Sequence, residues 1–438
     1  MRVTRRQVLG MLGGAAGAVA TGGRGWAARA PGGFQPEGDQ TQKRFLSPPE
    51  KGPIRVGWIA PFTGPFAQNA KDMWDGFRLY FEEIGMQAAG RKIELISEDS
   101  WVEPAEALTK LRKLVERDQV HVAAGALLAP SAYALQGYVN AQKIPFVVPI
   151  MSSDDITQRR IIPWYVRVSW TSSQPTQPLG DYCYKTLGYR KVAGINFDFA
   201  FGHESFAGFQ RVFEDLGGQV VQKLWTPATV SDFAPYLPTL RKDVDAIFAT
   251  LSGNPARQFL KQVTEYGIKA KTPIIGQGTL TDEHILPSMG EEAIGVITGL
   301  HYSEALDNPA NKRFKAAYEK LAGKIPSYYS ANCYTGARYI VEALVAVGGD
   351  IENRERYLAA LKKVELPDDP RGPVKIDQYG NPIQNIYIQK VEKVGGRLQN
   401  TVFHTYPNVS QFWTYTPEDF LKNPVYDRDK FPGCKFCA

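Results

Sequence analysis

The chain has 438 residues, of which 43% are hydrophobic, and its formal net charge is +6. This length suits two domains, and the apolar content suits a folded core. Because no basic run is interleaved with aromatic residues, the composition argues against a nucleic-acid-binding protein. No segment beyond the N-terminus approaches the roughly 18 apolar residues of a membrane span, so we expect a soluble mature protein.

The N-terminus has the pattern of an export signal. Arg5 and Arg6 precede an apolar stretch rich in Gly and Ala at residues 9–20, and small-residue cleavage patterns follow. An arginine pair in this place indicates the twin-arginine pathway, which exports folded proteins. We therefore predict a twin-arginine signal peptide over residues 1–30, a flexible leader over residues 31–52, and a periplasmic location.

The cysteines favour structural roles over chemistry. Cys183 and Cys333 lie in apolar helical patterns, where a cysteine usually acts as a small buried hydrophobe. Cys434 and Cys437 form a CxxC motif at the C-terminus, but the motif does not open a helix of a βαβ unit as a redox motif would. In an oxidising compartment we favour a local disulfide between them, or a role in holding the C-terminal tail in place. We predict no metal site and no cofactor.

Strands and helices alternate in the first half of the chain. The expected strands are 54–60, 92–97, 120–124 and 145–148, and the expected helices are 72–84, 104–117 and 131–142. Short apolar strands between longer amphipathic helices are typical of a parallel sheet that is covered on both faces. The first half therefore predicts an α/β lobe that opens with a βαβ unit.

The pattern pauses at residues 164–178 and then starts again. The expected strands are 191–196, 219–224, 246–250, 273–275 and 293–299, and the expected helices are 203–216, 233–241, 255–266, 309–321 and 327–347. Residues 374–376 and 383–391 predict a hairpin, and residues 406–438 an extended tail. Two similar runs indicate two α/β lobes. Ligands of such sheets bind beyond the carboxyl ends of the strands, so the loops after the strands should face a cleft.

Short motifs along the chain occur in an order and spacing that point to one family. They are Gly64-Pro65-Phe66-Ala67, Gly90–Leu95, Glu98-Asp99-Ser100, Gly125–Ser131, Ile144–Pro149, Arg167, Asp198–Gly202 and Gly372–Tyr387. With these motifs the chain resembles the type I periplasmic solute-binding proteins, and most closely the receptors of branched-chain amino-acid type ABC importers. The resemblance covers about residues 54–391.

The resemblance implies an α/β fold of two Rossmann-like lobes with parallel sheets, joined by three crossovers near Ser172, Leu300 and Pro373. The implied divisions are 53–172 plus 301–373 for lobe 1, 173–300 plus 374–405 for lobe 2, and 406–438 for a C-terminal tail. Closure of such lobes around a small-molecule ligand is a hinge motion that presents a docking face to an ABC transporter permease. Contact with the membrane would be limited to this permease, and the protein is expected to be a monomer.

The family's ligand contacts map onto loops at the carboxyl ends of the expected strands. The candidate ligand-binding residues are Phe66, Asn69, Trp101, Leu128, Ala129, Ser131, Met151, Ser152, Trp170, Phe201, Gly253, Gly278, His301, Tyr302 and Tyr329. Some of them have a second interpretation. Asn69 could cap a helix that begins near Lys71, and Trp170 could brace the hinge. His301 could sense ligand charge or could be a solvent-exposed hinge histidine.

One departure from the family decides the expected ligand. Relatives that bind amino acids pair the ligand ammonium with an acidic residue near the position of Gly278, and this chain has no acidic residue there until Asp282. A buried ammonium without an anion is costly. The aromatic candidates suit a flat organic molecule. We therefore predict an aromatic or other amine-free carboxylate, with a branched-chain amino acid or amide as the alternative.

The sequence gives little support to an enzyme. Its histidines are scattered, and no pair of them has a helical metal-binding spacing. The chain has neither a GxSxG nucleophile elbow nor a Gly-rich phosphate loop. We therefore expect a binding protein without catalytic residues. A ligand sensor of the same fold, which passes its signal to a regulatory partner, is an open alternative.

Overall fold

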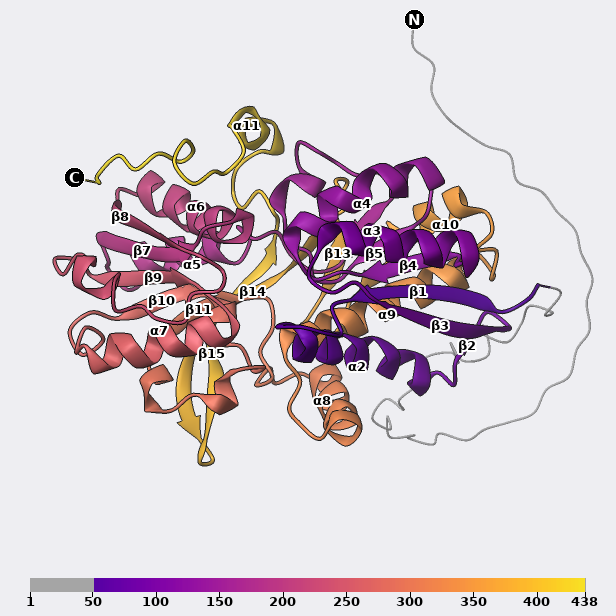
Figure 1. Cartoon of the computed structure of the whole chain (residues 1–438), viewed down its shortest axis with the longest axis horizontal. Helices are drawn as coiled ribbons and strands as arrows, with labels where there is room; N and C mark the ends of the chain where they lie inside the picture. The colour runs from indigo at the N-terminus through magenta and orange to yellow at the C-terminus, as the bar shows by residue number, and fades with distance from the viewer. Residues whose placement is uncertain (1–50, 438) are drawn as a thin grey trace, which may run out of the picture. The chain divides into compact units, whose positions relative to one another are not determined.

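Two β-sheets organise the chain (Figure 1). The computed structural model describes residues 51–437, and these belong to one compact unit. The predicted signal peptide at 1–30 and nearly all of the predicted leader at 31–52 lie outside the described residues. Within the described part, no helix is long and apolar enough to cross a membrane.

The first sheet and the helices on its faces form lobe 1. Its strands follow the order β2-β3-β1-β4-β5-β6, and all neighbours are parallel except the edge pair β2 and β3. The strands are β1 (Ile54–Ala60), β2 (Gln87–Ala88), β3 (Arg91–Asp99), β4 (Val122–Gly125), β5 (Phe146–Val148) and β6 (Tyr165–Arg167). Strand β1 lies inside the sheet and is almost fully buried, as its apolar sequence requires.

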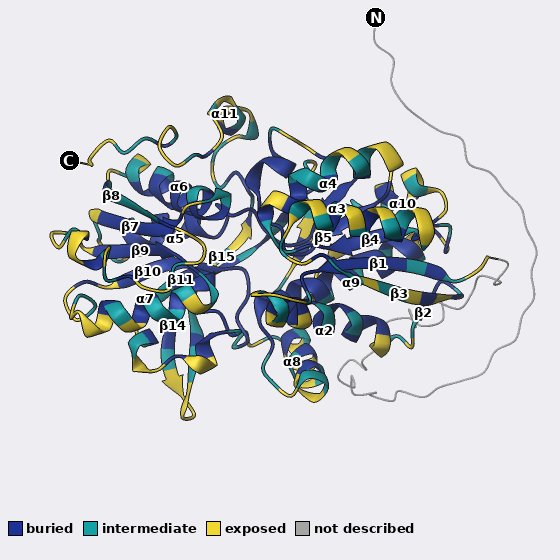
Figure 2. Ribbon diagram, in the orientation of Figure 1, coloured by how far each residue is buried: buried dark blue, intermediate teal, exposed yellow. Residues whose placement is uncertain are grey.

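Helices cover both faces of the lobe 1 sheet. They are α2 (Ala67–Glu83), α3 (Pro104–Arg112), α4 (Ala129–Gln142), α8 (Pro309–Ala322), α9 (Tyr328–Ala346) and α10 (Arg354–Leu361). Helix α2 packs closely against α9 because Gly76 has no side chain; a Cβ there would overlap the backbone of Ser330. Figure 2 shows the resulting pattern, with buried strands and with exposed residues on the outer faces of the helices.

The second sheet forms lobe 2, and its edge strands β12 and β13 reach into lobe 1. Its order is β12-β13-β14-β11-β10-β9-β7-β8, with β15 paired to β14. The strands are β7 (Lys191–Phe197), β8 (Gln219–Thr226), β9 (Ala246–Thr250), β10 (Ile274–Gln277), β11 (Ile297–Leu300), β12 (Glu365–Leu366), β13 (Val374–Ile376), β14 (Pro382–Val394) and β15 (Arg397–Val409). Strands β7 to β11 are parallel to one another, and β14 is antiparallel to β11. The main helices are α5 (Thr176–Lys185), α6 (Ala200–Asp215) and α7 (Gly253–Glu265).

Strand β14 connects the two lobes. Its first residues pair with β13, whose Val374 belongs to the hydrophobic core of lobe 1. Its later residues, Tyr387 to Lys390, pair with β11 of lobe 2. The chain also passes between the lobes at residues 168–175, between β6 and α5, and at residues 301–308, between β11 and α8. Three crossovers therefore join the lobes on one side of the molecule, which we call the hinge side.

Some predicted elements differ from the structure. The expected helix at 233–241 is only a 3₁₀ turn at Leu237–Thr239, because Pro235 and Pro238 interrupt helical hydrogen bonding. Helices α5 and α10 have no counterpart in the predicted elements. The predicted tail begins at residue 406, but β15 continues to Val409. That strand carries many exposed polar residues, so it lacks the alternation that would reveal it.

The remaining tail lies on lobe 2 (Figure 1). It contains α11 (Pro417–Lys422), and its Phe412, Phe420 and Tyr426 pack against Ala207 of α6. The Arg211 guanidinium of α6 lies 3.9 Å from the centre of the Tyr415 ring. A disulfide joins Cys434 and Cys437, as the sequence favoured, and Cys183 and Cys333 are buried free thiols.

Candidate ligand-binding site

A cavity of about 580 Å³ lies between the lobes, at the carboxyl ends of both sets of parallel strands. Its lining is Pro65, Phe66, Gln68, Asn69, Val102, Leu127, Leu128, Ala129, Ile150, Ser152, Trp170, Phe197, Phe199, Phe201, Ala228, Thr229, Val230, Ser231, Ser252, Gly253, Asn254, Pro255, Thr279, His284, Ile285, Tyr328 and Tyr329. Nearly all of these residues directly follow a strand, where ligands of open parallel sheets bind. The volume is typical of a small-molecule site.

Aromatic rings from both lobes dominate the wall. In lobe 2, the Phe197 and Phe199 rings stack with centroids 5.5 Å apart, and Phe201 continues the row. In lobe 1, the Tyr328 and Tyr329 centroids are 4.1 Å apart, and Trp170 meets Tyr328 edge to face. Two aromatic surfaces on opposite lobes suit a flat apolar group held between them.

Four helices begin at the cavity without a side-chain cap. They are α2 and α4 of lobe 1 and α6 and α7 of lobe 2, and the residue before each helix lines the cavity. The residues at these cap positions are Phe66, Leu128, Phe199 and Ser252; the first three have no acceptor, and Ser252 makes no cap hydrogen bond. Uncapped N-termini present the positive ends of helix dipoles and those N–H groups of the first turn that have no partner. Proline reduces this second contribution in α4 and α7, since Pro130 and Pro255 have no N–H. Both lobes therefore offer the cavity a potential that favours an anion.

Hydroxyl groups supplement these backbone donors. Ser152 lines the cavity, and its hydroxyl lies 3.0 Å from that of Ser172, whose single proton also reaches the Ser152 carbonyl at 3.0 Å. The Thr279 hydroxyl is already used, because it donates to the Leu251 carbonyl at 2.8 Å. Of these two lining hydroxyls, only that of Ser152 can exchange a hydroxyl partner for a ligand oxygen.

No Asp, Glu, Lys or Arg from residues 51–437 lines the cavity. Asp72 lies close to its wall, but it is bonded to His284 at 2.8 Å and to Lys324. Asp282 is buried and accepts the His284 backbone N–H, and burial raises the pKa of Asp282 to about 6. These two carboxylates near the cavity are thus engaged by protein groups and do not offer a free anion to a ligand.

The structure brings most of the predicted site residues together. Those that line the cavity are Phe66, Asn69, Leu128, Ala129, Ser152, Trp170, Phe201, Gly253 and Tyr329. Asn69 does not cap a helix, because α2 already begins at Ala67 and Asn69 lies in its first turn. Their convergence follows from one rule, since each of them except Tyr329 sits on a loop or helix start directly after a strand.

Three predicted residues in the lobe 1 loops do not line the cavity. Met151 is fully buried in the lobe 1 core, while its neighbours Ile150 and Ser152 face the cavity. This alternation is that of extended chain. Ser131 lies in the first turn of α4, two positions after the lining residue Ala129, and is buried. Trp101 is 47% exposed, and the left-handed backbone at this residue (φ 44°) is held by the Asp99 carboxylate, which accepts its N–H.

Three more predicted residues lie behind the cavity wall. Gly278 packs directly against Leu300, and its neighbour Thr279 takes the lining position. Tyr302 is fully buried, with its hydroxyl donating to Asn311 at 3.1 Å. His301 is also fully buried rather than solvent-exposed, and burial holds its pKa well below the usual range.

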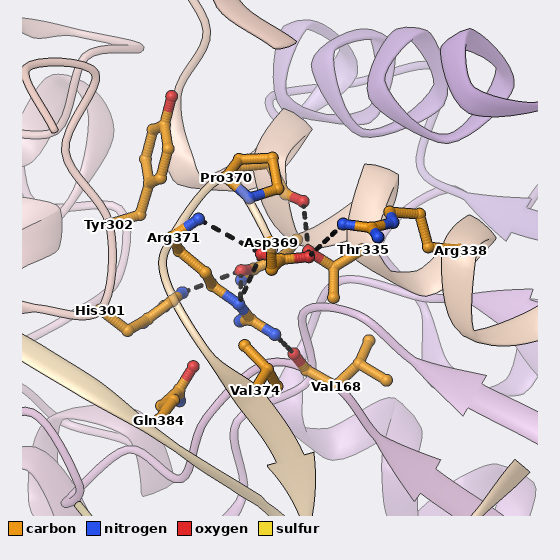
Figure 3. A network of polar contacts seen from close by, with 12 residues as sticks. Val168, His301, Tyr302, Thr335, Arg338, Asp369, Pro370, Arg371, Val374 and Gln384 are labelled. Carbon is orange, nitrogen blue, oxygen red and sulfur yellow. Dashed lines mark hydrogen bonds and ion pairs between the residues drawn. The ribbon is translucent and has the colours of Figure 1, made fainter. Parts of the chain in front are cut away.

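Figure 3 shows the buried polar network that contains His301. The His301 ring stacks on Trp170 at 4.8 Å and shares the Asn332 side-chain oxygen with Arg371. Arg371 also donates to the Val168 carbonyl and pairs with buried Asp369. We call Val168, His301, Asn332, Asp369 and Arg371 the hinge network. It joins the first two crossovers to the segment before β13, and its His301 ring lies directly behind Trp170 of the cavity wall.

Sequence reasoning missed part of the lining. Residues 228–231 follow β8, and the strand itself was predicted, so the same rule could have placed them at the cleft. His284 and Ile285 lie a few residues beyond the expected loop after β10. No cluster of three or more His, Cys, Asp or Glu that could hold a metal ion occurs within residues 51–437.

Comparisons with known proteins agree with this architecture. Residues 53–396 match the family model described as periplasmic binding protein. A Leu/Ile/Val-binding protein homolog 6 from Brucella suis biovar 1 is 30% identical, over 81% of this chain and 91% of its own length.

Two solved structures of solute-binding proteins are also similar to this chain. A solute-binding protein of an ABC transporter from Rhodopseudomonas palustris BisB5, in complex with 3,4-dihydroxybenzoic acid, is 35% identical with a TM-score of 0.78, over 82% of this chain and 98% of that one. A solute-binding protein from Rhodopseudomonas palustris HaA2, in complex with p-hydroxybenzoic acid, is 31% identical with a TM-score of 0.78 and the same coverage. The chain therefore belongs to the periplasmic binding protein family of type I, and it is a solute-binding receptor of the ABC transporter kind.

Proposed function

We propose that the ligand is an aromatic or other amine-free carboxylate. One observation carries this proposal: the described cavity wall is rich in aromatic rings and lacks an acidic side chain. A free α-amino acid would bury its ammonium group without an anion. A buried charge that has lost its partner costs about 3–5 kcal/mol. A carboxylate without an amine avoids this penalty.

The electrostatics of the site support an anionic end on the ligand. The uncapped starts of α2, α4, α6 and α7 direct partial positive charge to the cavity from both lobes. The Ser152 hydroxyl, which also lines the cavity, would donate to the same ligand oxygen in place of its contact with Ser172. The rings of Phe199, Phe201 and Tyr328 would hold the apolar remainder of the ligand.

Relatives support both the proposal and its alternative. Two similar receptors have been solved with hydroxylated benzoic acids, and these ligands are aromatic carboxylates without an amine. Other relatives are named for leucine, isoleucine and valine binding. A branched-chain amino acid or amide is therefore the second candidate, although the lining offers no free acidic side chain to its amine.

Calorimetric titration distinguishes these ligands. The purified protein should bind 4-hydroxybenzoate or 3,4-dihydroxybenzoate with a Kd in the micromolar range or below, about 8 kcal/mol of binding free energy. L-Leucine should give no heat under the same conditions. Tight binding of leucine without a response to either benzoate would refute the proposed ligand class and favour the alternative.

The role of the receptor is inferred from its family and its N-terminus. We infer that the protein is exported by the twin-arginine pathway, acts in the periplasm as a monomer, performs no catalysis, and delivers its ligand to an ABC transporter permease by hinge closure. Replacing Arg5 and Arg6 by lysine should leave the protein in the cytoplasm. Deleting the partner permease should abolish uptake of the ligand; normal uptake together with a lost transcriptional response would instead favour the sensor.

A further inference from the structure

One ion pair crosses the open side of the cleft, next to the cavity. Asp72 belongs to α2 of lobe 1, and His284 follows β10 of lobe 2. The His284 Nδ1 and the Asp72 Oδ2 are 2.8 Å apart, and the two side chains are only 11% and 2% exposed. His284 also lines the cavity, and its ring lies 5.7 Å from that of Tyr329. The contact thus joins the lobes beside the ligand site.

The partners of Asp72 differ in where they belong. Lys324 and Gln68 both bond the Asp72 Oδ1, and both are part of lobe 1. They remain with Asp72 when the lobes separate, whereas His284 moves away with lobe 2. Opening therefore leaves the Asp72 Oδ1 paired and exposes the Asp72 Oδ2 and the His284 ring to water. A contact of this kind breaks without leaving a buried unpaired charge, so it can form and break readily at ordinary temperature.

The charged surroundings of His284 favour its protonated form. Burial alone would lower its pKa, but the hydrogen bond to Asp72 and the charges of Asp282 and Asp72 outweigh burial and raise it, while Lys324 opposes them. The Tyr329 ring also lies against His284, and burial keeps the Tyr329 hydroxyl protonated by raising its pKa. Burial would raise the pKa of Asp72, yet the His284 and Lys324 hydrogen bonds hold it below the usual value.

We propose that Asp72 and His284 form a latch that closes with the lobes, so that ligand binding is coupled to uptake of a proton by His284. In the open protein the ring meets water and titrates as a free histidine, near pH 6.5. In the closed protein it holds its proton to higher pH. The protonated contact therefore stabilises closure fully at a pH below the pKa of His284 in the open protein. This stabilisation is lost as the pH rises through the higher pKa of His284 in the closed protein.

The proposal is tested by calorimetric titration of the full mature chain at about pH 7, in buffers of different ionisation enthalpy. The probe is 4-hydroxybenzoate, or L-leucine should the aromatic acid not bind. The latch rests on the receptor function and not on the ligand class, so failure of the benzoate refutes only the proposed ligand. The wild type should take up a fraction of one proton per ligand bound.

His284→Gln and Asp72→Asn should each abolish this uptake. Each should also weaken binding between about fivefold and twentyfold near pH 6 and much less near pH 8.5. His203→Gln is the matched control, because His203 makes a 2.9 Å contact with Asp198 inside lobe 2. It should keep the proton uptake and affinity of the wild type.

Other outcomes would overturn the latch. If His284→Gln is folded and takes up the same amount of proton as the wild type, the proton belongs to another group. If only Asp282→Asn then loses the uptake, that group is Asp282. A binding loss in His284→Gln that is the same at every pH would make His284 a simple wall residue. Absence of proton uptake in the wild type would remove the coupling altogether.

Discussion

The two lobes meet on two sides of the cavity, and the contacts on these sides have opposite character. On the hinge side, Arg371 and Asp369 are fully buried, and the polar side chains of the first crossover are buried with them. On the cleft side, the lobes meet through apolar walls and through the Asp72–His284 pair, in which the His284 side chain keeps 11% exposure. The hinge side is permanent, because the chain itself crosses there.

The difference reflects what each side must do. Gln384 donates to the Ser169 carbonyl at 2.7 Å, and Gln174 donates to the Pro382 and Val409 carbonyls at 2.9 Å. These buried bonds have no water to replace them, so breaking one costs the full desolvation of its groups. Contacts that must open with every transport cycle need groups that water can solvate again. The cleft side uses such groups, and the hinge side does not.

The largest effect should come from the hinge network. Arg371→Met removes the buried guanidinium that pairs with Asp369 and donates to the Asn332 oxygen, and it leaves the Val168 carbonyl without that donor. We expect the free energy of unfolding to fall by about 3–5 kcal/mol, as measured by chemical denaturation. Arg241→Met is the control, because Arg241 pairs with Asp243 at the surface. If the free energy of unfolding falls equally in both variants, the buried hinge network contributes no more stability than a surface ion pair.

The next effect should appear at the cavity wall. Phe201→Ala removes a ring that lies in the aromatic row of lobe 2. The loss of its apolar contact should weaken binding of 4-hydroxybenzoate between about tenfold and a hundredfold. Because Phe201 also belongs to the lobe 2 core, the variant loses stability as well, and the affinity is measured on protein that is shown to be folded. Phe403→Ala, at an exposed ring on β15, should leave the affinity unchanged. Equal affinities in the two variants would show that the lobe 2 row does not hold the ligand.

The smallest effect should come from the tail, which adds a further bridge on the hinge side. The Arg159 guanidinium of lobe 1 donates to the Phe420 carbonyl at 3.1 Å and to the Asn423 carbonyl at 2.9 Å. Arg159→Ala should lower the free energy of unfolding by about 1–3 kcal/mol and speed hydrogen exchange in residues 412–437. Ligand affinity should not change.

Arg160→Ala is the matched control for the tail, since its side chain lies over the Tyr133 ring of lobe 1. Hydrogen exchange of the tail in this variant should equal that of the wild type. A change in ligand affinity in Arg159→Ala would mean that the tail also governs opening of the cleft. The contacts of the hinge side would then not be independent of those of the cleft side.

Local sequence patterns were enough to establish the architecture. Apolar strands such as β1, flanked by amphipathic helices, are typical of covered parallel sheets, so the α/β class and the order of most elements were predictable. Because strand ends and binding loops coincide in such sheets, Phe66, Ser152 and Phe201 could be assigned to one site from their positions in the chain. The missing acid near Gly278 was also visible in the sequence.

The starts of the helices at the cavity, in contrast, depended on the tertiary fold. The predicted starts at 72, 131, 203 and 255 were all late, and the observed helices start at Ala67, Ala129, Ala200 and Gly253. A helix start is recognised in sequence by a side chain that caps it, and here no side chain does so. Nor could local sequence pair Asp72 with His284, since 212 positions separate them and only closure of the lobes brings them together.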